Sequence, residues 1–289
     1  MRRTFLFAVK IAISAALLYW AFRSVDLATL GGHFARLDPV WVIAAVFALG
    51  TQIALAGLRW AQIASTLGLA LPAGRAIRFS AIAAFFNQAL PSTIGGDAMR
   101  VWLLGRADRR WKNAIFSVIV DRVAGVASLA LVVAACLPWS LDRIAAPEGR
   151  VAILVIGLGG VAALPAILIV GSSRLSQRLA VWRLLRLPIE IAVASRAVLF
   201  GRHAGVIAPL SIAIHFLTVA AAWSLARAIA IAPDALIFLI LIPPVMLIAM
   251  IPISVGGWGI REGAMVVAFG YTGMEPSQAL AVSVLMGGS

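Results

Sequence analysis

The sequence predicts an all-α, polytopic helical membrane protein with about six to eight membrane segments. Of its 289 residues, 63% are hydrophobic and only 12% are charged, and the mean hydropathy is +1.04. Soluble domains are about half apolar and about a quarter charged, so the chain departs toward the membrane class on both measures. The apolar runs are continuous rather than alternating, which disfavours a β-barrel.

The apolar runs follow one another without a flexible linker, which predicts a single integral membrane domain over residues 1–289. Two arginines precede the first run, as in a secretory signal, but no small-x-small cleavage site follows, so the run is interpreted as a membrane helix. A last apolar piece, at 277–287, is too short to span. The predicted full spans lie roughly at 4–22, 39–57, 114–137, 151–171 and 205–231.

Two membrane segments are interrupted by nearly the same residues. "PSTIGGDAMR" (91–100) and "PISVGGWGIR" (252–261) share Pro, Ser or Thr, Ile or Val, two glycines and a final arginine. Matched breaks in two halves of a membrane chain indicate an internal repeat, here with halves of roughly 1–137 and 151–289. Chance is the alternative, because Gly and Pro are common in membrane helices.

The distribution of positive charge predicts the topology. With the N-terminus in the cytoplasm, the connector 58–78 and its three arginines lie inside. The five-cation segment 97–112 also stays inside only if 79–96 dips into the membrane and returns. By the same count the second break enters from the outer side, so the two breaks form an inverted pair of re-entrant, or broken, helices.

Backbone breakers beside charges indicate a binding site. Irregular backbone at membrane depth needs protein or a wet cavity around it. Glycine permits close approach, a helix start favours an anion, and arginine offers two donors to phosphate. The alternative is that the glycines only permit helix packing and the arginines lie at the headgroup boundary. The candidate substrate-binding residues are Asn87, Pro91, Gly95, Gly96, Asp97, Arg100, Asp121, Arg122, Pro252, Gly256, Gly257, Arg261 and Glu262.

Charges inside a span need partners. Asp121 and Arg122 lie about 13 Å into their predicted helix, a depth at which ionisable groups are costly and often functional. Being adjacent, they point different ways, and Arg100 or Arg261 is the expected partner of Asp121. A purely structural ion pair is the alternative. We expect Glu262 to orient an arginine, and His215 to be a packed, hydrogen-bonded contact.

No cofactor or metal is expected. The chain has one cysteine, Cys136, and three scattered histidines without metal-ligand spacing, and it lacks a GxxxxGK[ST] motif. The net charge of +13 is carried between apolar runs, which favours anionic lipid headgroups as partners and not nucleic acid.

These residues resemble the flippase-like membrane domain of lysylphosphatidylglycerol synthases, in a stand-alone relative without the aminoacyl-transferase domain. The matching stretches are "LRW" (58–60), "FFNQALPSTIGGDAMR" (85–100), "DRVAG" (121–125) and "PISVGGWGIREG" (252–263). The resemblance implies a multi-pass protein of the bacterial cytoplasmic (inner) membrane that moves a lipid between leaflets. The short final segment departs from the family pattern.

The sequence therefore predicts a lipid flippase or transporter and not an enzyme, with membrane lipids as partners. Two alternatives remain open: a non-transporting scaffold of a lipid or envelope synthesis complex, and an enzyme acting on lipid-linked phosphate with an acidic residue as acid or base. A second copy of the chain and lipid-synthesis proteins are the further partners that the sequence allows.

Overall fold

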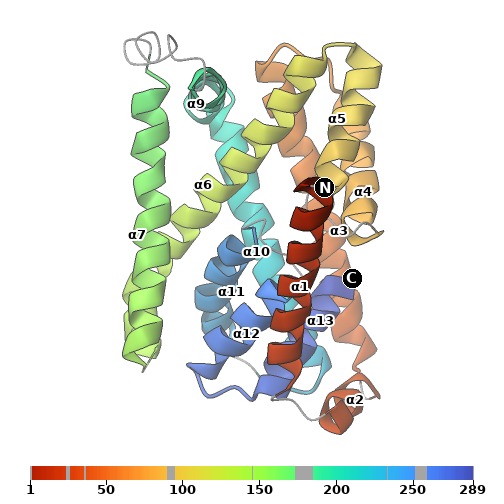
Figure 1. Ribbon diagram of the computed structural model, residues 1–289, viewed down its shortest axis with the longest axis vertical. Helices are drawn as coiled ribbons and strands as arrows, with labels where there is room; N and C mark the ends of the chain where they lie inside the picture. The colour runs from red at the N-terminus through yellow and green to blue at the C-terminus, as the bar shows by residue number, and fades with distance from the viewer. Residues whose placement is uncertain are drawn as a thin grey trace.

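The computed structural model describes residues 2–23, 27–35, 37–89, 95–144, 146–172, 185–232, 234–250 and 259–288. The regular elements in these ranges are helices, and four of them, α3, α6, α7 and α10, are long and apolar enough to cross a membrane (Figure 1). The predicted all-α membrane fold is confirmed. The helices are α1 (Arg2–Phe22), α2 (Leu27–Ala35), α3 (Pro39–Thr66), α4 (Ala73–Ala89), α5 (Gly95–Asp108), α6 (Trp111–Arg143), α7 (Pro147–Val170), α9 (Arg186–Leu199), α10 (Ala204–Ala228), α11 (Ala235–Ala249), α12 (Ile260–Gly270) and α13 (Pro276–Gly288).

Helices α4 and α5 form the first broken hairpin, which enters the molecule and returns to the end it came from (Figure 1). The Asn113 side chain at the start of α6 donates to the Leu67 carbonyl just after α3, at 3.1 Å. The Ala70 N–H before α4 donates to Asp108 at the end of α5, also at 3.1 Å. The end of α3, both outer ends of the hairpin and the start of α6 therefore lie together, which confirms the predicted dip.

Helices α11 and α12 form the second broken hairpin, at the opposite end of the molecule. Asp234, just before α11, forms an ion pair with Arg143 at the far end of α6. Tyr271, just after α12, lies beside Gly149 at the start of α7. Both outer ends of this hairpin are therefore at the end where α6 stops, so the inverted arrangement of the two hairpins is confirmed. The division into repeat halves stays a prediction.

One end of the molecule, where α3 ends and α6 begins, is strongly basic and is called the basic end below. It carries Arg75, Arg78, Arg106, Arg109, Arg110, Lys112, Arg186, Arg196 and Arg202, against Asp108 and Glu190. The described residues of the opposite end are balanced: Arg23, Arg143, Arg150 and Arg227, against Asp38, Asp142, Glu148, Asp234 and Glu275. This asymmetry has the form expected of a protein with one cytoplasmic face.

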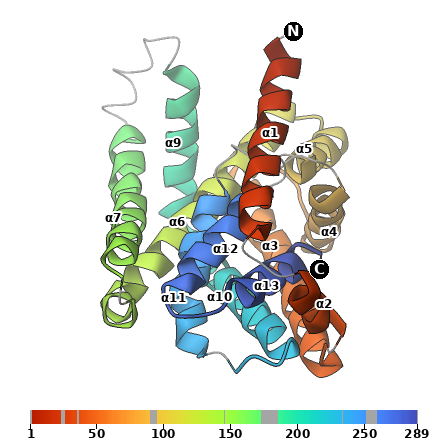
Figure 2. The same cartoon turned by 60° about the horizontal axis from the view of Figure 1, so that its bottom comes forward.

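Helix α9 lies across the basic end. It is seen end-on in Figure 1 and lengthwise in Figure 2. One of its faces is buried, through Ile189, Ala192 and Val198, and Glu190 forms an ion pair with Lys112 of α6 at 2.8 Å. The stretch between α7 and α10 thus contains an amphipathic helix of the kind that lies at a membrane surface.

Two helix boundaries differ from the sequence prediction. Helix α3 continues to Thr66 instead of ending near the "LRW" triplet, because Ala61, Ile63 and Ala64 after that triplet are buried against the rest of the molecule. Helix α6 runs past the predicted end at 137 to Arg143, with Pro138 inside it. The short final segment is a 13-residue helix, α13, about 20 Å long at the usual helical rise.

Candidate functional site

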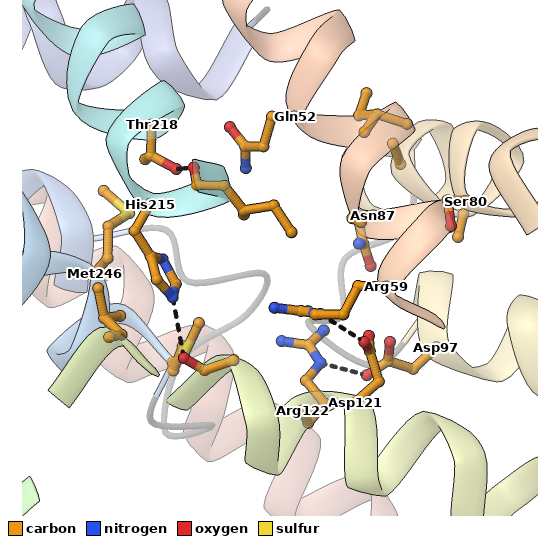
Figure 3. A pocket seen from close by; sticks show the side chains of 18 of the residues that line it. Gln52, Arg59, Ser80, Asn87, Asp97, Asp121, Arg122, His215, Thr218 and Met246 are labelled. Carbon is orange, nitrogen blue, oxygen red and sulfur yellow. Dashed lines mark hydrogen bonds and ion pairs between the residues drawn. The ribbon is translucent and has the colours of Figure 1, made fainter. Parts of the chain in front are cut away.

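A cavity of about 300 Å³ lies inside the molecule, among α3, α4, α5, α6, α10 and α11. Figure 3 shows charged side chains on one side of it, and His215, Thr218 and Met246 on the other. The polar and charged residues that line it are Gln52, Arg59, Ser80, Asn87, Asp97, Arg100, Asp121, Arg122, His215 and Thr218.

Asp121 of α6 holds two arginines in the wall of this cavity. Its carboxylate accepts from Arg59 Nε at 2.8 Å and from an Arg100 guanidinium nitrogen at 2.9 Å. All three residues are buried, with Asp121 only 2% exposed. The carboxylate lies about 15 Å from the start of α6 at the helical rise of ~1.5 Å per residue. The expected partnership of Asp121 with Arg100 is therefore confirmed.

Arg59 was assigned by the sequence analysis to an inside connector, and this assignment is wrong. The residue lies within α3, is 7% exposed, and reaches Ser211 of α10 at 3.3 Å as well as Asp121. The signal for its position was present in the sequence, because the residues that follow "LRW" remain apolar enough to continue a membrane helix.

Asp97 and Arg122 form a second, more open ion pair beside the first. Arg122 Nε lies 2.7 Å from the Asp97 carboxylate, and the Arg122 side chain is 42% exposed. Asp97 also lies 3.7 Å from Arg100, one turn along α5. Asp121 and Arg122 thus point to different partners, as their adjacency predicted, and Asp97 joins the two pairs into one network.

The lining residues give the cavity an excess of positive charge. Three arginines and two aspartates line it, so its formal charge is +1 when His215 is neutral. Arg100 also stacks over the Trp60 ring, 4.2 Å from the centroid, and Trp60 is held by a hydrogen bond to Ser117. An arginine clamped in this way keeps its guanidinium in one place, which suits it for an anion.

Several polar atoms of the lining have no hydrogen-bond partner within the described part of the chain. They are Gln52 Oε1, Ser80 Oγ and Arg100 Nε. Buried polar atoms are nearly always hydrogen-bonded, so each such atom needs an explanation. Because all three belong to residues that line one cavity, a polar ligand or water in that cavity is the simplest explanation.

The first break brings Asn87 and Gly96 together. Asn87 Oδ1, on α4, accepts the N–H of Gly96 in the first turn of α5 at 2.9 Å, so a helix start follows the break as predicted. A Cβ at Gly96 would lie 2.4 Å from the Ala83 carbonyl oxygen. Gly96 therefore serves close packing of the two helices, and Gly95 and Gly96 are not among the residues that line the cavity.

His215 is a packed contact, as expected. Its Nε2 lies 2.9 Å from Ser128 Oγ and 3.1 Å from the Gly125 carbonyl. The ring is 7% exposed and connects α10 to α6. It also forms part of the cavity wall, which the sequence analysis did not anticipate.

The second hairpin places its charges elsewhere. Glu262 is fully buried and accepts from Arg261 at 2.6 Å, which confirms that it orients an arginine. Its other oxygen accepts the Gly259 N–H at 2.6 Å, and Arg261 Nε also reaches Ser283 of α13 at 3.3 Å. Neither Arg261 nor Glu262 lines the cavity. The candidates Pro91, Pro252, Gly256 and Gly257 lie outside the described residues.

Comparison with protein families identifies the chain. A family model described as the lysylphosphatidylglycerol synthase TM region matches residues 7–288. The chain belongs to this family. Comparison with curated proteins gives no match, and neither does comparison with solved structures. The family and the helices together establish a multi-pass membrane protein of a lipid-related family.

Proposed function

We propose that this protein moves a lipid with an anionic, phosphate-bearing headgroup between the leaflets of a bacterial cytoplasmic membrane. The observation that carries the proposal is the cavity among membrane helices whose wall holds three arginines and two aspartates. Charges at that depth are costly and are typically kept where a polar substrate passes. The family membership supports a lipid as the substrate.

The arginine network suits a phosphodiester better than a cation or a neutral sugar. Arg59 and Arg100 share one carboxylate, so their remaining N–H donors have room for a second acceptor. Gln52 and Ser80 add polar atoms that lack partners within the described residues. An incoming phosphate oxygen would accept from the Ser80 hydroxyl and from Arg100 Nε without requiring any ion pair around Asp121 to break. Gln52 Oε1 is itself an acceptor and would take a hydroxyl of the headgroup.

The proposal places the basic end in the cytoplasm, with the N-terminus on the same side, because cytoplasmic loops are enriched in Lys and Arg. The arginines there would also concentrate anionic lipid at the entrance. Cysteines introduced as Arg110→Cys and Asp142→Cys test this orientation. A membrane-impermeant thiol reagent applied to spheroplasts should label only the Asp142→Cys variant. Labelling of only the Arg110→Cys variant would mean that the basic end faces outward.

A lipid-scrambling assay tests the transport itself. The purified protein is reconstituted into liposomes containing headgroup-labelled phosphatidylglycerol, and the label is destroyed from outside. We expect the wild-type protein to expose the inner-leaflet label. Arg122→Gln should slow this exposure about tenfold, the effect of losing one charge-assisted contact of ~1.4 kcal/mol. Because Arg122 is partly exposed, the variant is expected to fold.

Arg143→Gln is the matched control, since Arg143 lies on the same helix and forms a half-exposed ion pair away from the cavity. Its rate should equal that of the wild type. Lipid binding without label exposure in any variant would instead support a scaffold. A chemically altered lipid in the mass spectrum would support an enzyme.

A further inference from the structure

A second hollow of about 430 Å³ lies between α5 and α6. Its walls are mainly apolar and include Val101, Trp102, Trp111 and Ile115. Trp102, Trp111 and Ile115 are each more than 40% exposed, so the hollow is a groove on the outer surface of the helix bundle. In a membrane such a surface faces lipid chains.

The groove runs from the basic end into the middle of the molecule. Gly105, near the end of α5, packs against Trp111 at the start of α6, so this part of the groove lies at the basic end. Arg122, eleven residues further along α6, lines the other end. At ~1.5 Å per residue the groove is about 16 Å long, which is roughly half of a ~30 Å hydrocarbon core and therefore one leaflet deep.

The groove and the central cavity share a wall. Asp97 and Arg122 line both, and they form the most exposed ion pair of the charge network. The Arg122 side chain is 42% exposed and that of Asp97 19%, so the pair can be reached from the groove. Asp97 also has Arg100 within 3.7 Å, so it keeps a positive neighbour if Arg122 turns to another acceptor.

Charge at the mouth of the groove indicates what enters it. The Arg106 guanidinium stacks over the Trp102 ring, 5.3 Å from the centroid. An arginine held on an aromatic ring at a membrane surface attracts anionic headgroups, and tryptophan favours the same depth. The groove is thus an apolar trough with Arg106 beside its outer end and the Asp97–Arg122 ion pair at its inner end.

We propose that the α5–α6 groove is a lateral lipid site, in which one acyl chain of an anionic phospholipid lies along the groove and its phosphate replaces Asp97 as the partner of Arg122. From there the headgroup enters the central cavity beside Arg100, while the chains stay in the membrane. The inference deepens the proposed function and rests on it for the headgroup's destination.

Photo-crosslinking of the full chain tests the site. The protein is reconstituted with phosphatidylglycerol that carries a diazirine in its acyl chain, irradiated, and mapped by mass spectrometry. We expect adducts concentrated on the groove residues of α5 and α6, and reduced at least fivefold by Ala98→Trp, which fills the groove. Ala162→Trp, at an exposed position on α7, should leave them unchanged. Phosphatidylcholine with the same chain should label the groove less, and Arg122→Gln should abolish that preference.

Each other outcome overturns the site. Adducts spread evenly over the lipid-facing helices, or adducts insensitive to Ala98→Trp in a variant whose melting profile matches the wild type, would remove the groove as a binding site. Cross-links from the groove to a second copy of the chain would make it a subunit interface instead. The crosslinking and scrambling assays test the groove and the proposed function independently. Groove adducts without exposure of the inner-leaflet label contradict only the proposed function. Label exposure without groove adducts contradicts only the groove.

Discussion

The two broken hairpins match at six of ten positions around their breaks but use their arginines differently. In the first, Arg100 reaches across to Asp121 on α6 and lines the cavity. In the second, Arg261 is held by Glu262, its neighbour in sequence, and by Ser283 of α13. The two hairpins are alike in form and enter from opposite ends of the molecule, but the contacts of their arginines differ.

The position of the acidic residue explains the difference. Asp97 precedes Arg100 by one helical turn and is 3.7 Å away, which leaves the guanidinium to pair more closely with Asp121. Glu262 directly follows Arg261, is fully buried, and uses both carboxylate oxygens within α12 and α13. A shared proline–glycine–arginine motif therefore fixes a backbone break, while a single acid decides whether the arginine is available to a ligand.

Removal of the acid shared by two arginines should have the largest effect. Asp121→Asn leaves Arg59 without its acidic partner in a buried site and leaves Arg100 with only Asp97, at 3.7 Å. Breaking a buried pair in this way costs about 3–5 kcal/mol. We expect a clear drop in melting temperature in detergent and loss of lipid scrambling. Asp234→Asn, at an exposed ion pair, should cost about 1 kcal/mol or less. Equal melting temperatures for both variants would show that the ion pairs of Asp121 do not stabilise the fold.

A methyl group at the tight crossing of the first hairpin should come next. In Gly96→Ala the new Cβ meets the Ala83 carbonyl oxygen at 2.4 Å, and backbone cannot yield easily. Overpacking of this kind costs about 1–3 kcal/mol. Gly263→Ala in the second hairpin meets the Trp20 ring at an ordinary 3.4 Å and should be nearly neutral. Thermal unfolding of the two variants checks the contrast, which fails if Gly263→Ala is the more damaging.

Charge removal on α6 beside the first hairpin, and within the second hairpin, should separate binding from stability. Arg122→Gln should weaken lipid scrambling about tenfold, equivalent to ~1.4 kcal/mol, with little change in melting temperature. The double variant Arg261→Gln/Glu262→Gln removes a buried pair that does not line the cavity. This double variant should lower the melting temperature. Its scrambling rate per folded molecule should stay within about twofold of the wild-type rate. The opposite pattern would place the site in the second hairpin.

The smallest expected effect is at Gln52. Gln52→Leu removes a buried oxygen that has no partner among the described residues, so stability should be unchanged or raised by about 1 kcal/mol. Scrambling should nevertheless fall by about threefold to tenfold, the worth of one hydrogen bond. Gln62→Leu, further along α3 and away from the cavity lining, is the control. An equal loss of scrambling in both variants would mean that the effect comes from a general change in α3 and not from the cavity.

The sequence predicted the architecture because hydrophobic length and charge asymmetry are strong signals in membrane proteins. The re-entrant path of α4 and α5 followed from the cations of 97–112 alone, and the contacts between Leu67 and Asn113 agree with it. The pairing of Asp121 with Arg100, one of the two partners expected, also followed from the rule that charges inside spans are rare and need partners. The pairing of Asp97 with Arg122 was not predicted.

The remainder of the site depends on distances that sequence does not contain. Arg59 was missed because an arginine–tryptophan pair is also what the end of a membrane span looks like. Arg261 was given the same role as Arg100 because the two motifs match. The structure distinguishes the two arginines by their partners, which are Asp121 for Arg100 and Glu262 for Arg261. Ser80 and Thr218 gave no signal, because hydroxyl side chains are common in membrane helices and commonly bond to their own backbone.

The formal charge of +1 in the cavity also bears on energetics under a membrane potential. A unit charge moved through 100 mV involves about 2.3 kcal/mol of electrical work. One bound monoanion would cancel the excess of the three arginines over the two aspartates. In the proposed transport cycle, the lipid-bound cavity would then carry no excess charge, and only the empty cavity would be sensitive to the membrane potential.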